Sequence, residues 1–188
     1  MGKLVKYEAR VAGYYRWLKA VKLINAPKFI VDNNVGKLAK WLRIMGYDAL
    51  FFKDGNDSYM IAIALAEGRV ILTRDTQIVK RRVVTRGQLK VILIQSDKSE
   101  LQMQQVIDTL NIDCQFRPFT ICLECNQSLL DRSKQQVKDL VPPYVFQTQH
   151  KYMECPACHR IYWRGTHWHA MIQYLEHYMT NCLDSPVG

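Results

Sequence analysis

The sequence lacks any long hydrophobic run. None of its apolar stretches approaches the ~20 residues that a membrane-spanning helix needs. It also lacks the uninterrupted apolar core of a secretory signal, because Lys and Arg recur throughout its first residues. Internal repeats and low-complexity tracts are missing as well. We therefore expect a globular protein with no membrane partner.

Acidic residues are scarce relative to basic ones. The 188 residues include 26 Lys or Arg and 17 Asp or Glu, which gives a formal net charge of +9. This excess favours a polyanionic partner such as nucleic acid, although basic proteins that bind none are common. With 48% hydrophobic residues, the chain can bury a proper core, and one domain with a small appendage is the natural expectation.

Much of the positive charge lies near the start of the chain. Residues 1–28 hold seven Lys or Arg against Glu8, so they carry +6 of the total. Their apolar residues recur at alternating threes and fours, which predicts an amphipathic helix. Three roles compete for it: a helix docked on the main body, an arm that contacts nucleic acid, or an organelle-targeting peptide. The missing Ser and Thr argue against targeting.

Cysteine is used sparingly but in a definite pattern. Four of the six cysteines form two C-x-x-C pairs, Cys122 with Cys125 and Cys155 with Cys158. Four thiolates at this spacing predict a structural Zn²⁺ site. A disulfide framework is the alternative, but a chain of this size without a signal peptide has no need of one. Zinc implies a reducing compartment, so we expect the protein in the cytoplasm.

Short apolar runs alternate with helical patterns between residues 28 and 110. The runs at 29–31, 49–52, 70–72 and 91–94 suit strands that are covered on both faces. Residues 36–45, 58–67 and 99–110 show helical spacing, and a short basic helix is expected through Arg81 and Arg82. Such alternation predicts an α/β fold with a parallel sheet.

Acidic residues follow these runs. Asp32 ends the first and Asp75 follows the third, and the carboxyl ends of parallel strands share one edge of a sheet. Asp54 or Asp57 follows the second run, and Asp97 the fourth. Carboxylates gathered there predict a Mg²⁺ or Mn²⁺ site that activates water for attack on a phosphodiester. The competing explanation is that each Asp only caps the helix after it.

Several cations could hold the phosphates of a bound nucleic acid. One set recurs at a spacing of three on a predicted helix and consists of Lys37, Lys40 and Arg43. The other set lies close to Asp75 in the sequence and consists of Arg74, Arg81 and Arg82. Farther along, residues 162–169 mix aromatic rings with Arg164, His167 and Trp168. This mixture suits stacking on unpaired RNA bases, and it equally suits a small core between the zinc segment and the body.

Together these segments resemble the Mut-seven-C RNase domain family, a branch of the PIN-like nucleases with a C-terminal zinc ribbon. The resemblance covers residues 28–174 and rests on residues 28–32, 36–48, 67–75, 122–126 and 155–168. It implies a PIN-like three-layer α/β/α sandwich and metal-dependent endoribonuclease activity. The acidic cluster would comprise Asp32, Asp57 and Asp75, with Asp97 as a fourth member. The family usually shows adjacent acids where this chain separates Asp54 from Asp57, so that choice stays open.

The chain is thus expected to divide into a basic N-terminal helix (1–27), a PIN-like nuclease body (28–113), a zinc ribbon with a C-terminal helix (114–178) and a tail (179–188). Residues 133–140 should form a helix within the ribbon that stops at Pro142 and Pro143. The expected function is cleavage of RNA with catalytic Mg²⁺ or Mn²⁺ and structural Zn²⁺. A non-catalytic RNA-binding zinc-ribbon protein is the first alternative, and a scaffold for protein partners is the second.

Overall fold

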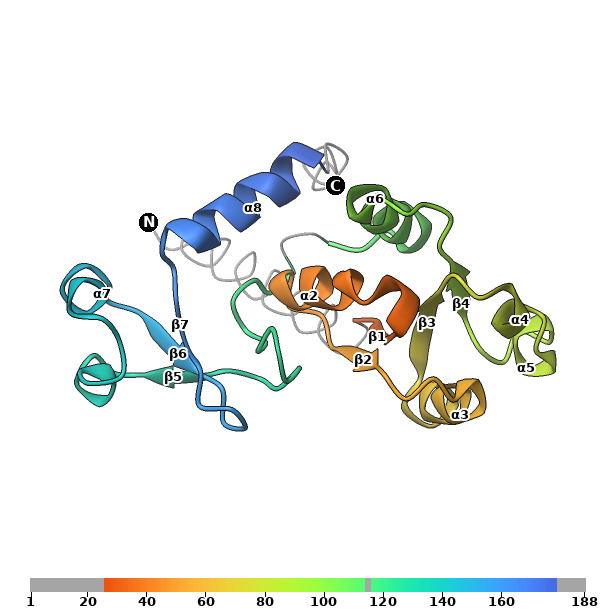
Figure 1. Ribbon diagram of the computed structural model, residues 1–188, viewed down its shortest axis with the longest axis horizontal. Helices are drawn as coiled ribbons and strands as arrows, with labels where there is room; N and C mark the ends of the chain where they lie inside the picture. The colour runs from red at the N-terminus through yellow and green to blue at the C-terminus, as the bar shows by residue number, and fades with distance from the viewer. Residues whose placement is uncertain (1–25, 114–115, 179–188) are drawn as a thin grey trace, which may run out of the picture.

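A four-stranded parallel sheet lies at the centre of the body (Figure 1). The computed structural model describes residues 26–113 and 116–178. The strands are ordered β2-β1-β3-β4 and all neighbours run parallel, as the sequence predicted; they are β1 Lys28–Asp32, β2 Ala49–Phe52, β3 Arg69–Thr73 and β4 Val91–Leu93.

Helices cover both faces of this sheet, which explains why its strands are apolar without alternation. Side chains on opposite sides of β1 enter different cores: Phe29 and Val31 join one cluster and Ile30 joins the other. The first cluster includes buried residues of α2 Lys37–Ile44 and α6 Ser99–Leu110. The second includes those of α3 Asp57–Glu67 and α4 Thr76–Val79. Every residue of β3 is buried, as a central strand between two helical layers requires.

Local signals set most element boundaries. Gly46 follows α2 with a φ of +91°, a conformation that favours glycine. Asn56, and not Asp57 as the sequence suggested, caps α3, because its Oδ1 accepts the backbone N–H of Tyr59 at 3.1 Å. The basic helix expected through residues 81 and 82 is instead two short helices, α4 and α5 Arg82–Thr85. Arg81 lies between them in an extended conformation that interrupts the helix.

A second, antiparallel sheet belongs to the cysteine-rich part of the chain. Its three strands are ordered β5-β6-β7 and span Leu130–Arg132, Tyr152–Glu154 and Ile161–Trp163. The helix predicted at 133–140 is wrong: only the 3-10 turn η2 Gln135–Val137 forms there. The prolines begin a helix, α7 Pro143–Thr148, because a proline in the first turn needs no N–H partner.

The last element, α8 Thr166–Tyr178, returns the chain to the body. Its side chains Trp168, Met171 and Ile172 pack against the core cluster that α2 and α6 build. No helix in the described ranges has the length and apolarity to cross a membrane. The predicted N-terminal helix falls almost wholly on residues 1–25, outside the described residues, as do Cys114, Cys182 and the tail from 179.

Candidate functional site

Asp32 lies at the carboxyl end of β1 and is held there by three hydrogen bonds. Val31 pairs with Leu72 of β3, so Asp32 comes to lie beside Thr73. The Thr73 hydroxyl donates to Asp32 Oδ2 at 2.6 Å, and the Asn34 side chain donates to the same oxygen at 2.8 Å. Asp32 Oδ1 accepts the backbone N–H of Asn33 at 2.6 Å. The carboxylate is therefore fixed in place at the mouth of the sheet.

Asp75 follows β3 and is joined to Asp32 through Thr73. Its backbone N–H donates to the Thr73 hydroxyl at 2.9 Å, and that hydroxyl donates on to Asp32. Its own Oδ1 caps α4 by accepting the N–H of Gln77 at 2.7 Å. The capping role weighed from the sequence is therefore present, but it uses one carboxylate oxygen. Oδ2 of Asp75 receives no hydrogen bond from the described residues and is available to a ligand.

The remaining predicted acids follow the outer strands β2 and β4. Asp57 is half-buried in the first turn of α3, while Asp54 is exposed in the preceding turn. Asp97, after β4, forms an ion pair with Arg74, and its side chain is 81% exposed. Among the residues that the structure describes, no three carboxylates come close enough to share an ion in the way the cysteines do. The acids thus line one edge without forming a compact cluster.

The predicted phosphate-binding cations separate into exposed and buried groups. Arg74, Arg81 and Arg82 are exposed, and so is Lys37. Lys40 is exposed and pairs with Glu124 at 3.0 Å. These positions are compatible with the predicted role.

The prediction that Arg43 binds phosphate is wrong, because this residue is not exposed as the other cations are. It is only 5% exposed, and its guanidinium donates to the carbonyls of Ala49, Leu123 and Glu124 at 2.7–3.1 Å. Burial lowers the pKa of this guanidinium, although nearby anionic groups act in the opposite direction. At 3.6 residues per turn, a residue six positions after Lys37 lies about 120° around the helix, not on the same face. Arg43 therefore joins α2 to the start of β2 and to the segment of the first knuckle.

The four predicted zinc cysteines do come together. The Sγ atoms of the four residues all lie within 4.8 Å of one another, and those of Cys122 and Cys158 are 3.8 Å apart. A tetrahedral site with Zn–S bonds of about 2.3 Å requires sulfurs about 3.8 Å from one another. The donor set and its spacing fit a structural zinc ion.

The two knuckles repeat the same backbone geometry. In each, the N–H of the first cysteine donates five residues ahead, from Cys122 to Gln127 at 2.8 Å and from Cys155 to Arg160 at 3.1 Å. In each, the residue after the second cysteine has a left-handed φ, 59° at Asn126 and 57° at His159. Burial alone would raise the pKa of the Cys122 thiol, but hydrogen bonds from the Tyr162 hydroxyl and the backbone lower it to about 7. These hydrogen bonds favour the thiolate at Cys122, the form that binds a metal, whereas a hydrogen bond with Cys158 and burial raise the pKa of Cys125.

A polar network joins the first knuckle to the opposite, amino end of the parallel sheet. Asn126 accepts the N–H of Ala49 at 2.9 Å and donates to Asp48 at 2.5 Å. Arg69 binds Asp48 with two parallel hydrogen bonds of 2.7 and 3.0 Å, and also donates to the carbonyl of Phe29 at 3.0 Å. Burial works to raise the pKa of Asp48, but the hydrogen bonds from Arg69 and Asn126 hold it below its ordinary value.

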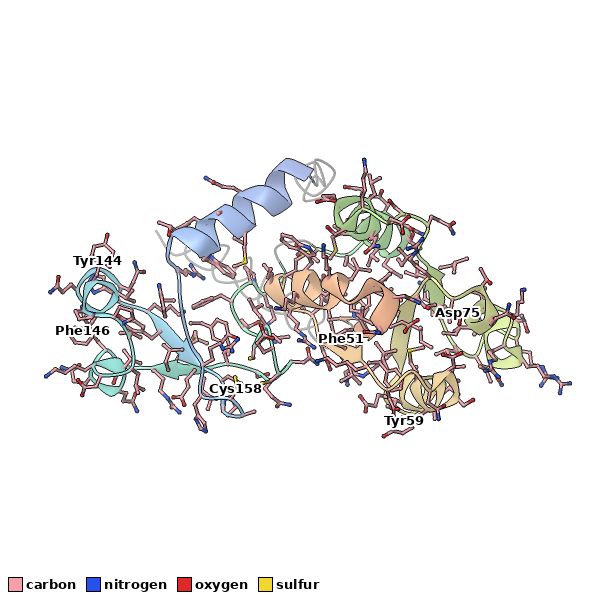
Figure 2. All side chains as sticks on the ribbon, in the orientation of Figure 1. Phe51, Tyr59, Asp75, Tyr144, Phe146 and Cys158 are labelled. Atoms are coloured by element: carbon pink, nitrogen blue, oxygen red, sulfur yellow. The ribbon has the colours of Figure 1, made fainter. Side chains whose placement is uncertain are left out.

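Asp48, Arg69 and Asn126 all lie within the motifs that carry the family resemblance, but the sequence predicted no role for them. The signal that could have found them is chemical: a carboxylate, a guanidinium and an amide close to strand starts and next to a cysteine pair. Figure 2 shows Asp75 and Cys158 far apart, with α2 and the central strands between them. The motif residues therefore divide between two separate places, the acidic edge and the cysteine cluster.

The aromatic–cation run near the C-terminus is partly core. Trp168 packs edge-on against Phe119, with ring centroids 5.1 Å apart, and it also packs against the core cluster that includes residues of α2 and α6. Arg164 is exposed and lies over the Phe119 ring at 5.7 Å. The side chain of His167 is outside the described part of the structure.

Comparison with known proteins identifies the family. A family model described as the Mut7-C RNAse domain matches residues 27–175. Searches of curated proteins and of solved structures find no match. The matched region contains both the acidic strand ends and the two cysteine pairs, and it spans most of the 188 residues. The chain belongs to the Mut7-C RNAse domain family.

Proposed function

We propose that this protein is a metal-dependent endoribonuclease with a PIN-like three-layer body. The observation that carries the proposal is the hydrogen-bonded link Asp32–Thr73–Asp75, which fixes two acidic positions on adjacent central strands. Membership in an RNase family makes RNA the natural substrate class. The exposed cations Arg74, Arg81 and Arg82 are close to Asp75 in the sequence. They would supply positive charge for the phosphates that flank the cleaved bond.

Asp32, Asp57 and Asp75 would hold the catalytic Mg²⁺ or Mn²⁺, with Asp97 as a weaker fourth ligand. Carboxylate oxygens are the donors that both ions prefer. When bound, such an ion lowers the pKa of a coordinated water and offsets the negative charge of the phosphate. The protein's own contribution is rigidity, because Thr73, Asn34 and the Asn33 amide orient Asp32 before any ligand arrives.

At the same edge, the Arg74 guanidinium can pair either with Asp97 or with a phosphate of bound RNA. In the present arrangement it neutralises Asp97, and its backbone N–H donates to the Asn34 side chain at 3.1 Å. A phosphate entering the edge would compete with Asp97 for this guanidinium. We therefore assign Arg74 to phosphate binding. Asp97 would hold Arg74 in place until RNA binds, and its carboxylate would then be released to act as the fourth metal ligand.

The cysteine cluster would bind one Zn²⁺ with a structural role. Four thiolates close the coordination sphere, so no position remains for substrate. Reduced, zinc-bound cysteines suit a reducing compartment, and on this ground we propose a cytoplasmic location. We also propose the division into a body at 28–113 and a ribbon with its helix at 114–178, with α8 as the element that joins them.

Cleavage by purified variants tests the catalytic proposal. Asp32→Asn and Asp75→Asn should each lower cleavage at least about 100-fold, because several kcal/mol of charge stabilisation would be lost with the ion. Asp131→Asn is the matched control, since Asp131 is exposed on β5, away from this edge. The substrates are a linear and a circular single-stranded RNA over a Mn²⁺ and Mg²⁺ titration, because only an endonuclease opens the circle. Reactions without divalent ions are preferable to chelation, which would also remove zinc.

Wild-type cleavage by both Asp32→Asn and Asp75→Asn would remove the proposed active site. One observation favours a second candidate, an RNA-binding zinc-ribbon protein without catalysis: the carboxylates of the described residues do not gather as tightly as the cysteines. That candidate predicts RNA binding with no cleavage at any concentration of either ion, in the wild type and the variants alike.

A further inference from the structure

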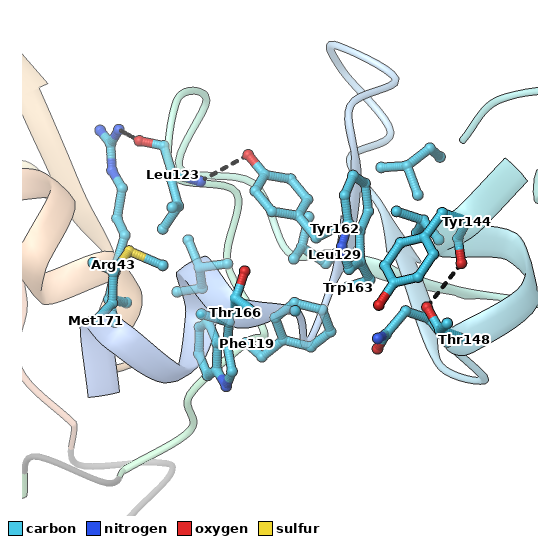
Figure 3. Close-up of a pocket in the computed structure, with 17 residues that line it drawn as sticks. Arg43, Phe119, Leu123, Leu129, Tyr144, Thr148, Tyr162, Trp163, Thr166 and Met171 are labelled. Carbon is cyan, nitrogen blue, oxygen red and sulfur yellow. Dashed lines mark hydrogen bonds between the residues drawn. The ribbon is translucent and has the colours of Figure 1, made fainter. Parts of the chain in front are cut away.

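A cavity of about 490 Å³ lies between the ribbon and the body (Figure 3). Its walls come from the end of α2, the segment around the first knuckle, α7, β7 and the start of α8. The volume falls within the range of small-molecule sites in proteins, roughly 300–1,000 Å³. The lining is mostly apolar and is rich in aromatic rings.

The aromatic residues of this cavity have two different roles. Phe119 is buried against Trp168, so this pair forms a packed floor. Tyr144 is 74% exposed, although its ring lines the cavity, and Trp163 is half-buried beside the mouth. Gly165 allows the indole to lie against the backbone, since a Cβ there would come within 2.8 Å of Trp163 Nε1. Trp163 also packs against the buried cluster of Val137, Val141 and Tyr152, so it is a fixed part of the wall, and Tyr144 is the exposed ring that can stack on a ligand.

Polar and charged groups surround the mouth. Thr148 and Thr166 are exposed lining residues. The Thr148 hydroxyl donates to the carbonyl of Tyr144 at 2.8 Å, so its oxygen is left to accept a hydrogen bond from the polar edge of a ligand. Arg164 is exposed beside the cavity and has no ion pair with a described carboxylate. Residues 116–173, which form the ribbon and most of α8, contain seven Lys or Arg against four Asp or Glu. The surroundings therefore favour a ligand that combines a flat aromatic group with negative charge.

We propose that this cavity binds one unpaired nucleobase of an RNA strand, with its phosphate beside Arg164. An unpaired base offers a π face for Tyr144 and a polar edge for the threonine hydroxyls. A purely apolar ligand would use the floor but leave the cation and the hydroxyls without a role. The inference rests on the proposed RNA substrate.

The position of the cavity defines what it does for an RNA. Figure 2 shows Tyr144 and Asp75 toward opposite ends of the long axis of the molecule. A base held at Tyr144 is therefore remote from the phosphodiester at the acidic edge, and an intervening stretch of RNA must connect the two. The cavity anchors the strand and selects RNAs with an unpaired base at a distance from the cut.

Binding of full-length, zinc-containing protein to a fluorescent single-stranded oligoribonucleotide tests this inference, with no Mg²⁺ or Mn²⁺ added so that the strand stays intact. Tyr144→Ala should weaken binding about fivefold or more, the lower bound for stacking of one base on an aromatic side chain. Because Tyr144 is largely exposed, this change should leave the fold intact. Tyr144→Phe keeps the ring and should bind like wild type. Leu140→Ala should do the same, since Leu140 is 62% exposed outside the cavity lining.

A fully paired duplex of the same sequence should bind Tyr144→Ala and wild type equally. Unchanged single-strand affinity in Tyr144→Ala, or an equal loss for the duplex, would overturn the assignment. So would an apolar dye that binds the cavity and is not displaced by RNA, because it would point to an apolar occupant. The experiment measures binding and does not depend on cleavage. If the predicted binding pattern is found in a protein that cuts no RNA, the cavity assignment stands and the proposed nuclease activity is rejected.

Discussion

Replacing Asn126 tests whether the first cysteine knuckle is part of the body's fold. Its side chain satisfies two groups at the start of β2, the N–H of Ala49 and the carboxylate of Asp48. Its backbone has a φ of 59°, which asparagine and glycine adopt more easily than other residues. Asn126→Ala therefore removes two long-range hydrogen bonds and puts an unsuitable residue in a left-handed conformation.

The expected loss of unfolding free energy is about 3 kcal/mol. A donor left without an acceptor costs about 1–3 kcal/mol, and a hydrogen bond to a charged group contributes a similar amount. Left-handed strain adds about 1–2 kcal/mol, while water reaching this partly exposed site offsets some of the total. For a chain of this size each kcal/mol shifts Tm by about 2–4 °C, so a decrease of about 6–12 °C is expected.

Asn126→Gly separates the two causes, since glycine accepts the left-handed φ and lacks only the side-chain bonds. It should be about 1 kcal/mol less destabilising than Asn126→Ala. Thermal unfolding followed by circular dichroism measures both, with zinc content determined on the same samples. An Asn126→Ala protein as stable as wild type would refute the view that this residue connects the ribbon to the sheet.

Asn126→Asp adds a dependence on pH with a definite sign. In the wild type the pKa of Asp48 is lowered by folding, so its contribution is present above the unfolded pKa of about 3.9 and is lost as pH falls through the folded value. In the variant a second carboxylate faces Asp48, so repulsion raises the pKa of the pair. Folding then takes up a proton, and the deficit in stability should shrink from pH 7 to pH 5. A constant deficit would contradict this.

Three further predictions concern other parts of the chain. Protein purified without chelators should contain one Zn²⁺ per chain, and Cys155→Ser should lose the ion along with stability that reaches the order of 10 kcal/mol in finger peptides; substoichiometric zinc in the wild type would contradict this. Gly46→Ala should cost at least about 2 kcal/mol in denaturant unfolding, because a Cβ would lie 2.2 Å from the carbonyl oxygen of Arg117. Gly55→Ala, with a φ of +74° and open space around it, should cost only about 1 kcal/mol, and equal costs would exclude the clash. Deleting residues 1–25 should flatten the salt dependence of RNA binding by about 0.7 in log–log slope per lost phosphate contact, whereas an unchanged slope would argue against an RNA-binding arm.

The elements that sequence predicted correctly are those fixed by local chemistry. The run at 70–72 gave a buried central strand because a strand covered on both faces directs apolar side chains to both helical layers. The two C-x-x-C pairs gave a cluster of sulfurs because their spacing alone determines each knuckle. Asp32 and Asp75 were predicted at the mouth of the sheet because parallel strands align their carboxyl ends.

The features that sequence missed depend on contacts between distant residues. Asn126 and Asp48 are 78 positions apart, and nothing in either neighbourhood indicates the other. Arg43 looked like a surface cation because its helix is rich in lysine, but the carbonyls that bury it belong to the knuckle segment at Leu123 and Glu124. The sequence predicted that Pro142 and Pro143 end a helix, whereas Pro143 begins α7, in the first turn, where its missing N–H costs nothing.

Because the chain is synthesised from its N-terminus, the packing of α8 on the body forms late in synthesis. The core cluster around Leu38 and Leu42 is covered in part by Met171 and Ile172, which leave the ribosome more than a hundred residues later. Until they arrive, part of an apolar surface next to a parallel sheet stays open to water and to other nascent chains, a state that favours aggregation. Slow translation before the last knuckle would prolong this interval. The body therefore completes the cover of this surface only after the cysteine-rich segment and α8 have been synthesised.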